Sequence, residues 1–173
     1  MAYSLEEFAA DCRAALQSDN GPGGRDAVRQ HLQRALRDES FVAAHLGPDV
    51  TKERDIIYED ADLGFCICAH VYAEPKQGNP HDHGPTWAIY GQAAGETEMT
   101  DWRMVVPPDG DKPGKVEMVR SYHLKPGDAH VYEVGDVHAP YRAAPTRLIR
   151  IEGENTDKIE RTPIEAVEST AEG

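Results

Sequence analysis

The spacing of apolar residues divides the chain into a helical first part and a longer part made of strands. Within residues 1–50, apolar side chains recur at helical intervals over 5–16 and again over 28–36. Ser4 stands at the start of the first stretch, with a glutamate three residues later, which is typical of a helix-capping box. Ser40 is expected to cap a third, short helix. We therefore predict an N-terminal segment of three helices.

From about residue 53 the pattern changes to short segments rich in Val, Ile, Tyr and Thr, separated by turns of Gly, Pro, Asp and Asn. Strands are predicted at 56–58, 63–72, 86–90, 97–106, 116–124, 130–134 and 147–151. Because so many short strands must hide their edges, they should close into a barrel or sandwich. We expect a barrel over residues 51–153, with segment 1–50 packed on it and an acidic, loosely held tail over 154–173.

Composition limits the kinds of partner that the protein can have. Its 173 residues suffice for one core. The 31 acidic residues outnumber the 18 Lys and Arg and give a net charge of −13, which argues against binding nucleic acid or an anionic membrane. Only three cysteines occur, no stretch approaches the roughly 18 apolar residues of a membrane span, and the N-terminus lacks the pattern of a signal peptide. We expect a cytoplasmic protein.

Histidines carry the clearest chemical signal. His81 and His83 follow a Gly-Asn-Pro turn at the start of a predicted strand, where residues two apart share a face and can converge on one metal ion. His138, in GDVHAPY, is the best candidate for the third ligand. The alternative is that surface turns simply hold hydrophilic histidines, which we would prefer for a lone His but not for this pattern. Asp82 should point away from the ligands and either support them from outside the coordination sphere or cap the turn.

Two segments resemble known motifs. The spacing in NPHDHGPTWAIYGQAAGETEMTDW and in KPGDAHVYEVGDVHAPY is similar to the two motifs of the cupin superfamily. His81 and His83 match the paired histidines of the first motif, Gly91 or Gly95 matches its closing glycine, and His138 matches the second motif. The resemblance implies a mainly β fold, the cupin double-stranded β-helix (jelly-roll barrel), with an N-terminal helical segment.

One departure from the cupin pattern narrows the resemblance. Many cupins carry a metal-binding Glu at the position that falls here near Trp87 and Ala88, neither of which binds metal. A three-histidine site without a carboxylate resembles the metal site of the thiol dioxygenases, which include cysteine dioxygenase. The His-Asp-His start and Asp101-Trp102 also resemble sequence features of that family. The resemblance implies one Fe(II) ion, although Ni or Zn could also bind in the purified protein, and a small-molecule thiol and O2 as substrates.

The same family uses an arginine upstream of the first histidine to pair with the substrate carboxylate. Arg54 matches that position; the alternative is an exposed Arg in a charged stretch. The family also carries a Ser-His-Tyr arrangement on a late strand, but the corresponding residues 144–153 contain neither His nor Tyr. Tyr90 and Tyr141 are further candidates for the rim of the pocket.

The segment GFCICAHVYA could compensate for that missing arrangement. Cys66, Cys68, His70 and Tyr72 alternate onto one face of the predicted strand. If this face points toward the metal pocket, His70 could act as the catalytic outer histidine and Tyr72 could bind substrate. The alternative is that the cysteines fill the core and His70 makes a buried hydrogen bond. A zinc site formed by Cys66, Cys68 and His70 lacks an evident fourth ligand.

Three functions remain open from the sequence. The first is a non-heme Fe(II) dioxygenase that oxidises a small carboxylated thiol to its sulfinate. The second is another metal-dependent cupin enzyme, such as an isomerase or a different oxygenase. The third is a non-catalytic cupin that binds a small ligand. Barrel edges could pair to form a homodimer, although the archetypal cysteine dioxygenases are monomers.

Overall fold

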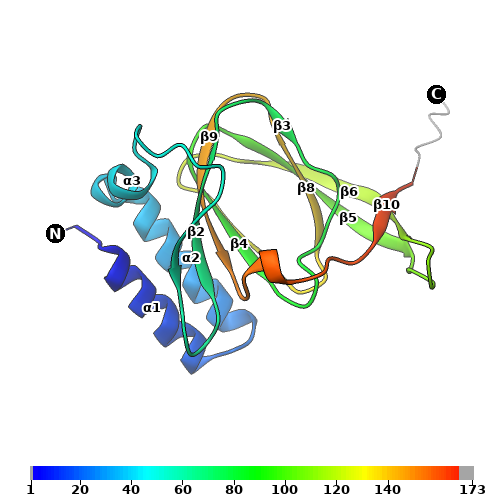
Figure 1. Ribbon diagram of the computed structural model, residues 1–173, viewed down its shortest axis with the longest axis horizontal. Helices are drawn as coiled ribbons and strands as arrows, with labels where there is room; N and C mark the ends of the chain where they lie inside the picture. The colour runs from blue at the N-terminus through cyan, green and yellow to red at the C-terminus, as the bar shows by residue number, and fades with distance from the viewer. Residues whose placement is uncertain (1, 168–173) are drawn as a thin grey trace.

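The computed structural model describes residues 2–167 and places three helices against one side of a β-barrel (Figure 1). The helices are α1 (Leu5–Ser18), α2 (Pro22–Arg37) and α3 (Glu39–Leu46). Ser4 caps α1 as predicted, because its hydroxyl accepts from the backbone N–H of Glu7. The predicted cap of α3 was wrong. Asp38 caps this helix by accepting from the N–H groups of Ser40 and Phe41, and Ser40 already lies inside the first turn.

Ten strands form two five-stranded sheets. In order across the first sheet they are β1 (Asp55–Glu59), β2 (Cys66–Tyr72), β9 (Thr146–Glu152), β4 (Ala88–Ala94) and β7 (Ala129–Tyr132). The second sheet contains β10 (Ile164–Ala166), β6 (Gly114–Leu124), β5 (Thr97–Val106), β8 (Val137–Arg142) and β3 (Lys76–Gln77). Among these strands only β1–β2 and β5–β6 are consecutive neighbours in one sheet. Every other connection crosses to the opposite sheet, which winds the chain into the predicted double-stranded β-helix.

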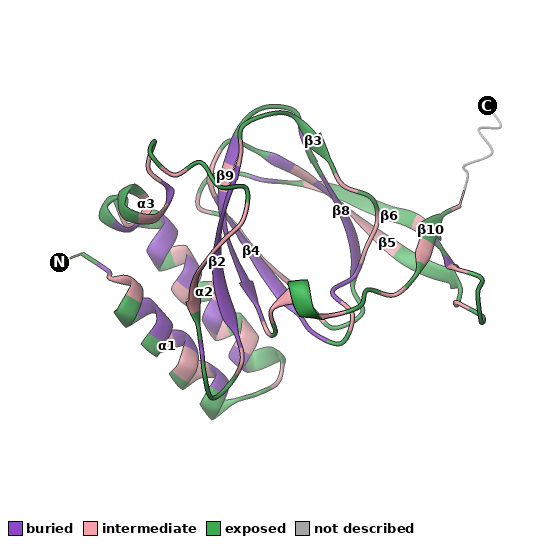
Figure 2. Ribbon diagram, in the orientation of Figure 1, coloured by how far each residue is buried: buried purple, intermediate pink, exposed green. Residues whose placement is uncertain are grey.

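Both faces of the first sheet are covered, and this explains why its central strands are apolar almost throughout. Ile67, Ile89 and Ile151 belong to the core that the sheet shares with the helices, and Figure 2 shows these strands as buried. The opposite face of the sheet lines the inside of the barrel. Gly91 allows α2 to approach β4, because a Cβ at this position would lie 2.7 Å from a methyl carbon of Leu32.

Three strands were not predicted: β3, β8 and β10. The most important is β8, because it carries His138. β8 contains Pro140, and a proline usually argues against a strand, so the sequence did not indicate one here. The chain tolerates the proline because it lies opposite Gly78, just beyond the end of β3, and its carbonyl accepts from the N–H of Gly78 at 2.8 Å. β3 and β10 span only two and three residues, too few to show a pattern.

The segment after residue 153 is held more firmly than expected over its described part. A short 3-10 helix, η1 (Thr156–Lys158), follows β9, and β10 then pairs with β6 in parallel. The carboxylate of Asp82 also accepts from the N–H of Thr162 at 3.0 Å. Thus β10 extends the second sheet and Thr162 is tied to the turn of Asp82, whereas residues 168–173 of the predicted tail lie outside the described residues.

Two expectations from composition can be compared with the structure. All three cysteines are free and buried, so they form no disulfide framework. Within residues 2–167, no helix has both the length and the apolar character needed to cross a membrane.

Candidate metal centre

His81 and His138 face each other across a β-bridge. Each backbone N–H donates to the other residue's carbonyl at 3.0 Å. Residues that are paired in this way project their side chains to the same side of a sheet, and the two imidazole centroids lie 4.7 Å apart. The bridge therefore brings together two residues that are far apart in the sequence.

His83 reaches the same point from a turn instead of from the predicted strand. Gly84 has a φ of +61°, and β4 begins only at Ala88. The carboxylate of Asp82 accepts from the N–H of Gly84 at 3.0 Å, so it caps the turn as predicted. The ligand atoms of His81, His83 and His138 all lie within 4.8 Å of one another.

Hydrogen bonding and burial prepare these imidazoles to bind a cation. Nδ1 of His81 lies 2.8 Å from the carbonyl oxygen of Asn79, which leaves Nε2 for a ligand. Burial lowers the pKa of His81 to about 4 and that of His83 to about 2. Burial also lowers the pKa of His138 well below its usual value. All three rings are thus neutral at physiological pH, the state in which imidazole donates a lone pair to a metal.

The separation of the nitrogens also fits a metal. Nε2 of His83 lies 3.2 Å from Nε2 of His138. Two nitrogens that each lie about 2.1 Å from one ion are roughly 3.0–3.4 Å apart, depending on the coordination geometry. Imidazole ligands suit Fe, Ni, Zn and Cu. Three neutral nitrogens could therefore hold one divalent transition metal here and leave coordination positions open.

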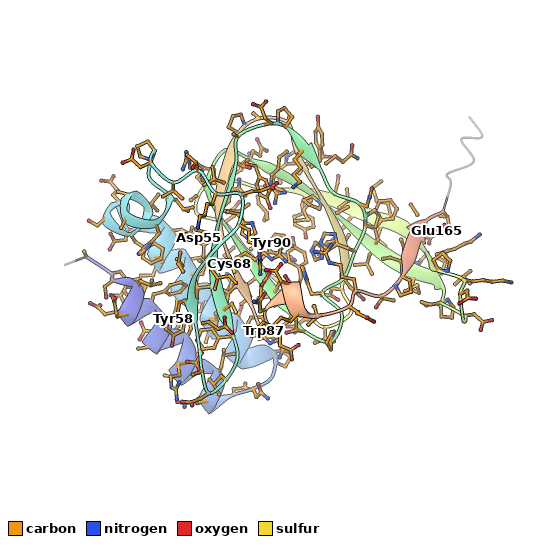
Figure 3. The ribbon with its side chains drawn as sticks, viewed as in Figure 1. Asp55, Tyr58, Cys68, Trp87, Tyr90 and Glu165 are labelled. Carbon is orange, nitrogen blue, oxygen red and sulfur yellow. The ribbon has the colours of Figure 1, made fainter. Side chains whose placement is uncertain are left out.

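Tyr90 was only a candidate for the rim, but the structure places its hydroxyl beside the ligand nitrogens. The hydroxyl oxygen lies 3.3 Å from Nε2 of His83 and 3.2 Å from Nε2 of His138. Figure 3 shows Tyr90 inside the barrel, between the two sheets. Burial raises the pKa of Tyr90, which keeps its phenol protonated and able to donate a hydrogen bond. The ring of Tyr132 stacks on His138 with the centroids 4.1 Å apart and fixes that imidazole.

A cavity of about 510 Å³ opens beside the histidines. His81 and Tyr90 belong to its lining, so the cavity reaches the metal centre. Four cationic side chains also line it: Lys76, Arg142, Arg150 and Arg161. Among the described residues, the lining contains no carboxylate. Because the whole chain has a net charge of −13, this concentration of positive charge is a specific feature of the cavity.

Arg142 is the most unusual of these cations. It is only 3% exposed, and within residues 2–167 no carboxylate pairs with it. Its guanidinium lies over the ring of Tyr72, 4.4 Å from the centroid. Burial lowers the pKa of Arg142 from its usual high value. Arg142 and His138 are four residues apart on β8 and therefore share a face of the strand.

The structure places Arg54 away from the cavity, contrary to its predicted role in binding substrate. Its guanidinium donates to both carboxylate oxygens of Glu152, at 3.0 and 2.8 Å, and it pairs with Asp157 at 3.2 Å. Arg54 does not line the cavity. Its hydrogen bonds to Glu152 are already made within the protein, so a substrate carboxylate would have to displace them. Arg142, in contrast, lines the cavity.

The predicted face of β2 points into the barrel, but its residues differ in position. Tyr72 lines the cavity, whereas His70 does not. The Tyr72 hydroxyl lies 3.2 Å from Nδ1 of His70, so His70 can orient Tyr72 but has no contact with the metal centre in its described surroundings. Burial lowers the pKa of His70 to about 3. Tyr141, the other predicted rim residue, is 43% exposed and does not line this cavity.

The zinc site on β2 that the sequence analysis disfavoured does not form in the described residues. The only group there with metal-ligating geometry is the three histidines, and Cys66, Cys68 and His70 do not belong to it. The sulfur of Cys68 lies 3.9 Å from a carboxylate oxygen of Glu152. Burial raises the pKa of the Cys68 thiol to about 12, so it is a protonated core residue.

Arg142, Arg150 and Tyr132 are site residues that the sequence did not reveal. The sequence did contain a signal for Arg142: it lies four residues after His138, so the two share a face if the segment is a strand. This signal can be used only once β8 is recognised as a strand. Arg150 likewise lies on the inner face of β9, between Leu148 and Glu152. No signal in the sequence singled out Tyr132.

Neither a protein-family model nor the sequence of a curated protein matches this chain. Solved structures do resemble it. KdgF from Halomonas sp. is 19% identical with a TM-score of 0.43, covering 57% of this chain and 74% of that chain. An uncharacterised protein with a double-stranded β-helix domain from Klebsiella pneumoniae is 16% identical with a TM-score of 0.48, covering 72% and 88%. A cupin superfamily protein from Desulfitobacterium hafniense is 12% identical with a TM-score of 0.44, covering 62% and 84%. Likeness at this level tells nothing about activity.

Proposed function

We propose that the protein is a non-heme Fe(II) dioxygenase that oxidises a small carboxylated thiol to its sulfinate with O2. The observation that carries this proposal is the position of three neutral imidazoles, with no carboxylate among them, beside a cavity lined with cations. Such a ligand set leaves open positions for substrates. A thiolate and a carboxylate would bring negative charge to a cavity whose described lining has cationic side chains and no carboxylate.

Iron(II) held by His81, His83 and His138 would supply the redox chemistry that combines a thiolate with O2. The net reaction is RS⁻ + O2 → RSO2⁻. The O–O bond breaks and two S–O bonds form, with sulfur as the source of the four electrons that reduce O2. The equation therefore balances without an added reductant.

The side chains around the cavity provide orientation and exclude water. Arg142 would bind the substrate carboxylate, because its planar guanidinium can donate to both oxygens. The Tyr90 hydroxyl would donate a hydrogen bond to a group bound at the three nitrogens, since it lies within 3.3 Å of two of them. Tyr72, oriented by His70, lies on the sheet opposite the one that carries Arg142, and would contact the substrate from that side. Leu148 contributes an apolar part of the lining.

A second candidate is a different metal-dependent cupin enzyme that acts on a small anion. It is favoured by the inner face of β9, which gives the cavity Leu148 and Arg150 and offers neither a His nor a Tyr. The outer-sphere histidine of thiol dioxygenases therefore has no counterpart at that position. Under this alternative the same metal centre and cationic cavity would serve another reaction.

Metal analysis followed by an oxygen-electrode assay tests the proposal. The protein is purified without added metal, its metal content is measured, and oxygen uptake is recorded with Fe(II) and with cysteine or 3-mercaptopropionate. Oxygen uptake with equimolar sulfinate formation is expected. Bound metal without oxygen uptake for any thiol would favour the second candidate, and protein that binds no divalent metal would contradict both.

A further inference from the structure

The cations that line the cavity differ in whether the protein neutralises them. Lys76 pairs with Glu53 at the surface. Arg150 lies 2.7 Å from Glu152, which it shares with Arg54. In contrast, neither Arg142 nor Arg161 has a carboxylate partner within residues 2–167. Two cations of the lining therefore lack an anion: one deep in the cavity and one, Arg161, at its exposed side.

The charge balance inside the barrel is positive even when the ion pairs are counted. Arg150 shares the carboxylate of Glu152 with Arg54, which also pairs with the exposed Asp157, so these two arginines are balanced by two carboxylates. Arg142 adds a positive charge that no described carboxylate balances. The other buried carboxylate near the centre, Asp82, is bound to the N–H groups of Gly84 and Thr162 and does not line the cavity. An isolated buried cation is costly to the folded protein, so an anionic ligand that pairs with it relieves part of that cost. A divalent metal on neutral imidazoles would add two more positive charges.

These charges exceed what one carboxylate and one thiolate would neutralise. Building on the proposed function, we propose that the substrate belongs to the thiol-bearing dicarboxylates, with one carboxylate bound by Arg142 and the second by Arg161. The cavity volume of about 510 Å³ is within the range of small-molecule sites and can hold both groups at once. The field of the cavity would also concentrate such dianions against the negative surface of the protein.

Binding of two four-carbon acids tests the charge of the ligand without any thiol chemistry. Succinate and butyrate differ only in the second carboxylate, and their affinities for the protein as purified can be compared by isothermal titration calorimetry. Succinate is expected to bind at least roughly tenfold more tightly, since charge-assisted hydrogen bonds are worth that factor or more. Equal affinities for the two acids would overturn the proposal.

Variants assign the two carboxylates to their arginines. Arg142→Gln and Arg161→Gln should each remove most of the preference for succinate. Arg103→Gln, which removes an equally charged but exposed residue that pairs with Glu117 on the β5–β6 hairpin, should preserve it. Circular dichroism establishes that each variant is folded. If Arg142→Gln does not fold, Arg161→Gln still decides the matter because Arg161 is exposed, and an unchanged preference in this variant would contradict the assignment.

Turnover separates this inference from the proposed function. Mercaptosuccinate and 3-mercaptopropionate differ by one carboxylate, and mercaptosuccinate is expected to have the higher kcat/KM by at least roughly tenfold. Preference for succinate with no thiol oxidised would support the dianion site and reject the dioxygenase. Oxidation of both thiols with equal kcat/KM would support the dioxygenase and reject the dianion site.

Discussion

Nε2 of His83 lies 3.2 Å from Nε2 of His138, although 55 positions separate the two residues in the chain. At this distance the lone pairs of two neutral rings would repel each other unless a proton or a cation lies between them. Burial keeps both rings neutral, so both Nε2 atoms can direct lone pairs at one cation when the ring hydrogens are on Nδ1. The relationship therefore ties the geometry of the barrel directly to its capacity to bind metal.

Replacing His83 with Ala should remove nearly all bound metal and leave the barrel folded. The variant loses one of three ligands, and even the loss of a supporting contact usually weakens metal binding 10–100-fold, so a larger effect of more than roughly 100-fold is expected. Metal content by atomic spectroscopy and folding by circular dichroism provide the measurement. His123→Ala is the control, because His123 is exposed and pairs with Glu96. Stoichiometric metal in the His83 variant would contradict the assignment.

Tyr90→Phe should lower kcat roughly 10–100-fold with little change in metal content. The substitution removes one hydrogen bond, worth about 1–3 kcal/mol, next to the nitrogens of His83 and His138. Oxygen uptake and metal analysis on the same sample test both parts. Tyr141→Phe changes an exposed tyrosine on the other face of β8 and should behave like the unmodified protein. Unaltered turnover in Tyr90→Phe would remove this residue from the mechanism.

Glu152 should make stability depend on pH in the acid range. Burial opposes its ionisation, but hydrogen bonds from Arg54 and the charge of Arg150 lower its pKa to about 2. Because this folded-state pKa is below the ordinary value, the stabilisation is complete above about pH 4.5 and is lost as the pH falls toward 2. The effect amounts to roughly 3 kcal/mol, since each pKa unit is worth about 1.4 kcal/mol.

Urea unfolding of the unmodified protein and of Glu152→Gln measures this contribution. The variant should be less stable at pH 7, and the difference in the free energy of unfolding should shrink as the pH is lowered from 4.5 toward 2. Glu165→Gln, at an exposed position on β10, is the control for effects of low pH on stability that do not involve Glu152. A difference between protein and variant that is constant over this range would show that Glu152 is not the group responsible.

Asp38→Ala should destabilise the protein by about 1–2 kcal/mol, because Asp38 caps α3 through two backbone N–H groups. Asp38 also accepts from the N–H of Tyr3 at 2.6 Å, so the loss affects the start of α1 as well. Ser40→Ala should change stability by only a few tenths of a kcal/mol. The midpoints of urea unfolding compare the two variants, and the reverse order would restore Ser40 as the cap.

Local patterns were sufficient to predict most of the fold. The helices present an apolar face at regular intervals, and the long strands have enough apolar residues to be recognised. The strand β8 was missed because Pro140 is tolerated only through its position opposite Gly78, and no local pattern shows which residues will lie opposite each other. The cap of α3 was missed by two residues because Asp38 and Ser40 are both good capping residues.

The metal centre could be predicted because its signal is partly local. The close spacing of His81 and His83 singled out the pair, although His83 lies in a turn and not on the predicted strand. His138 followed as the candidate third ligand, which the similarity to cupin motifs supported. The charges of the cavity are different, because their meaning depends on partners across the barrel. Arg54 and Arg142 look equivalent in the sequence, yet Glu152 neutralises the first and no described carboxylate neutralises the second.

The contact between Asp82 and Thr162 joins the chain's closing segment to the turn that bears His81 and His83. Arg161, Thr162 and Ile164 also line the cavity. A chain shortened at residue 153 would keep the three histidines of the metal centre. It would still lose the part of the cavity lining that includes Arg161, one of the two arginines without a carboxylate partner among the described residues. The smallest unit able to discriminate among anions therefore extends well past the last long strand.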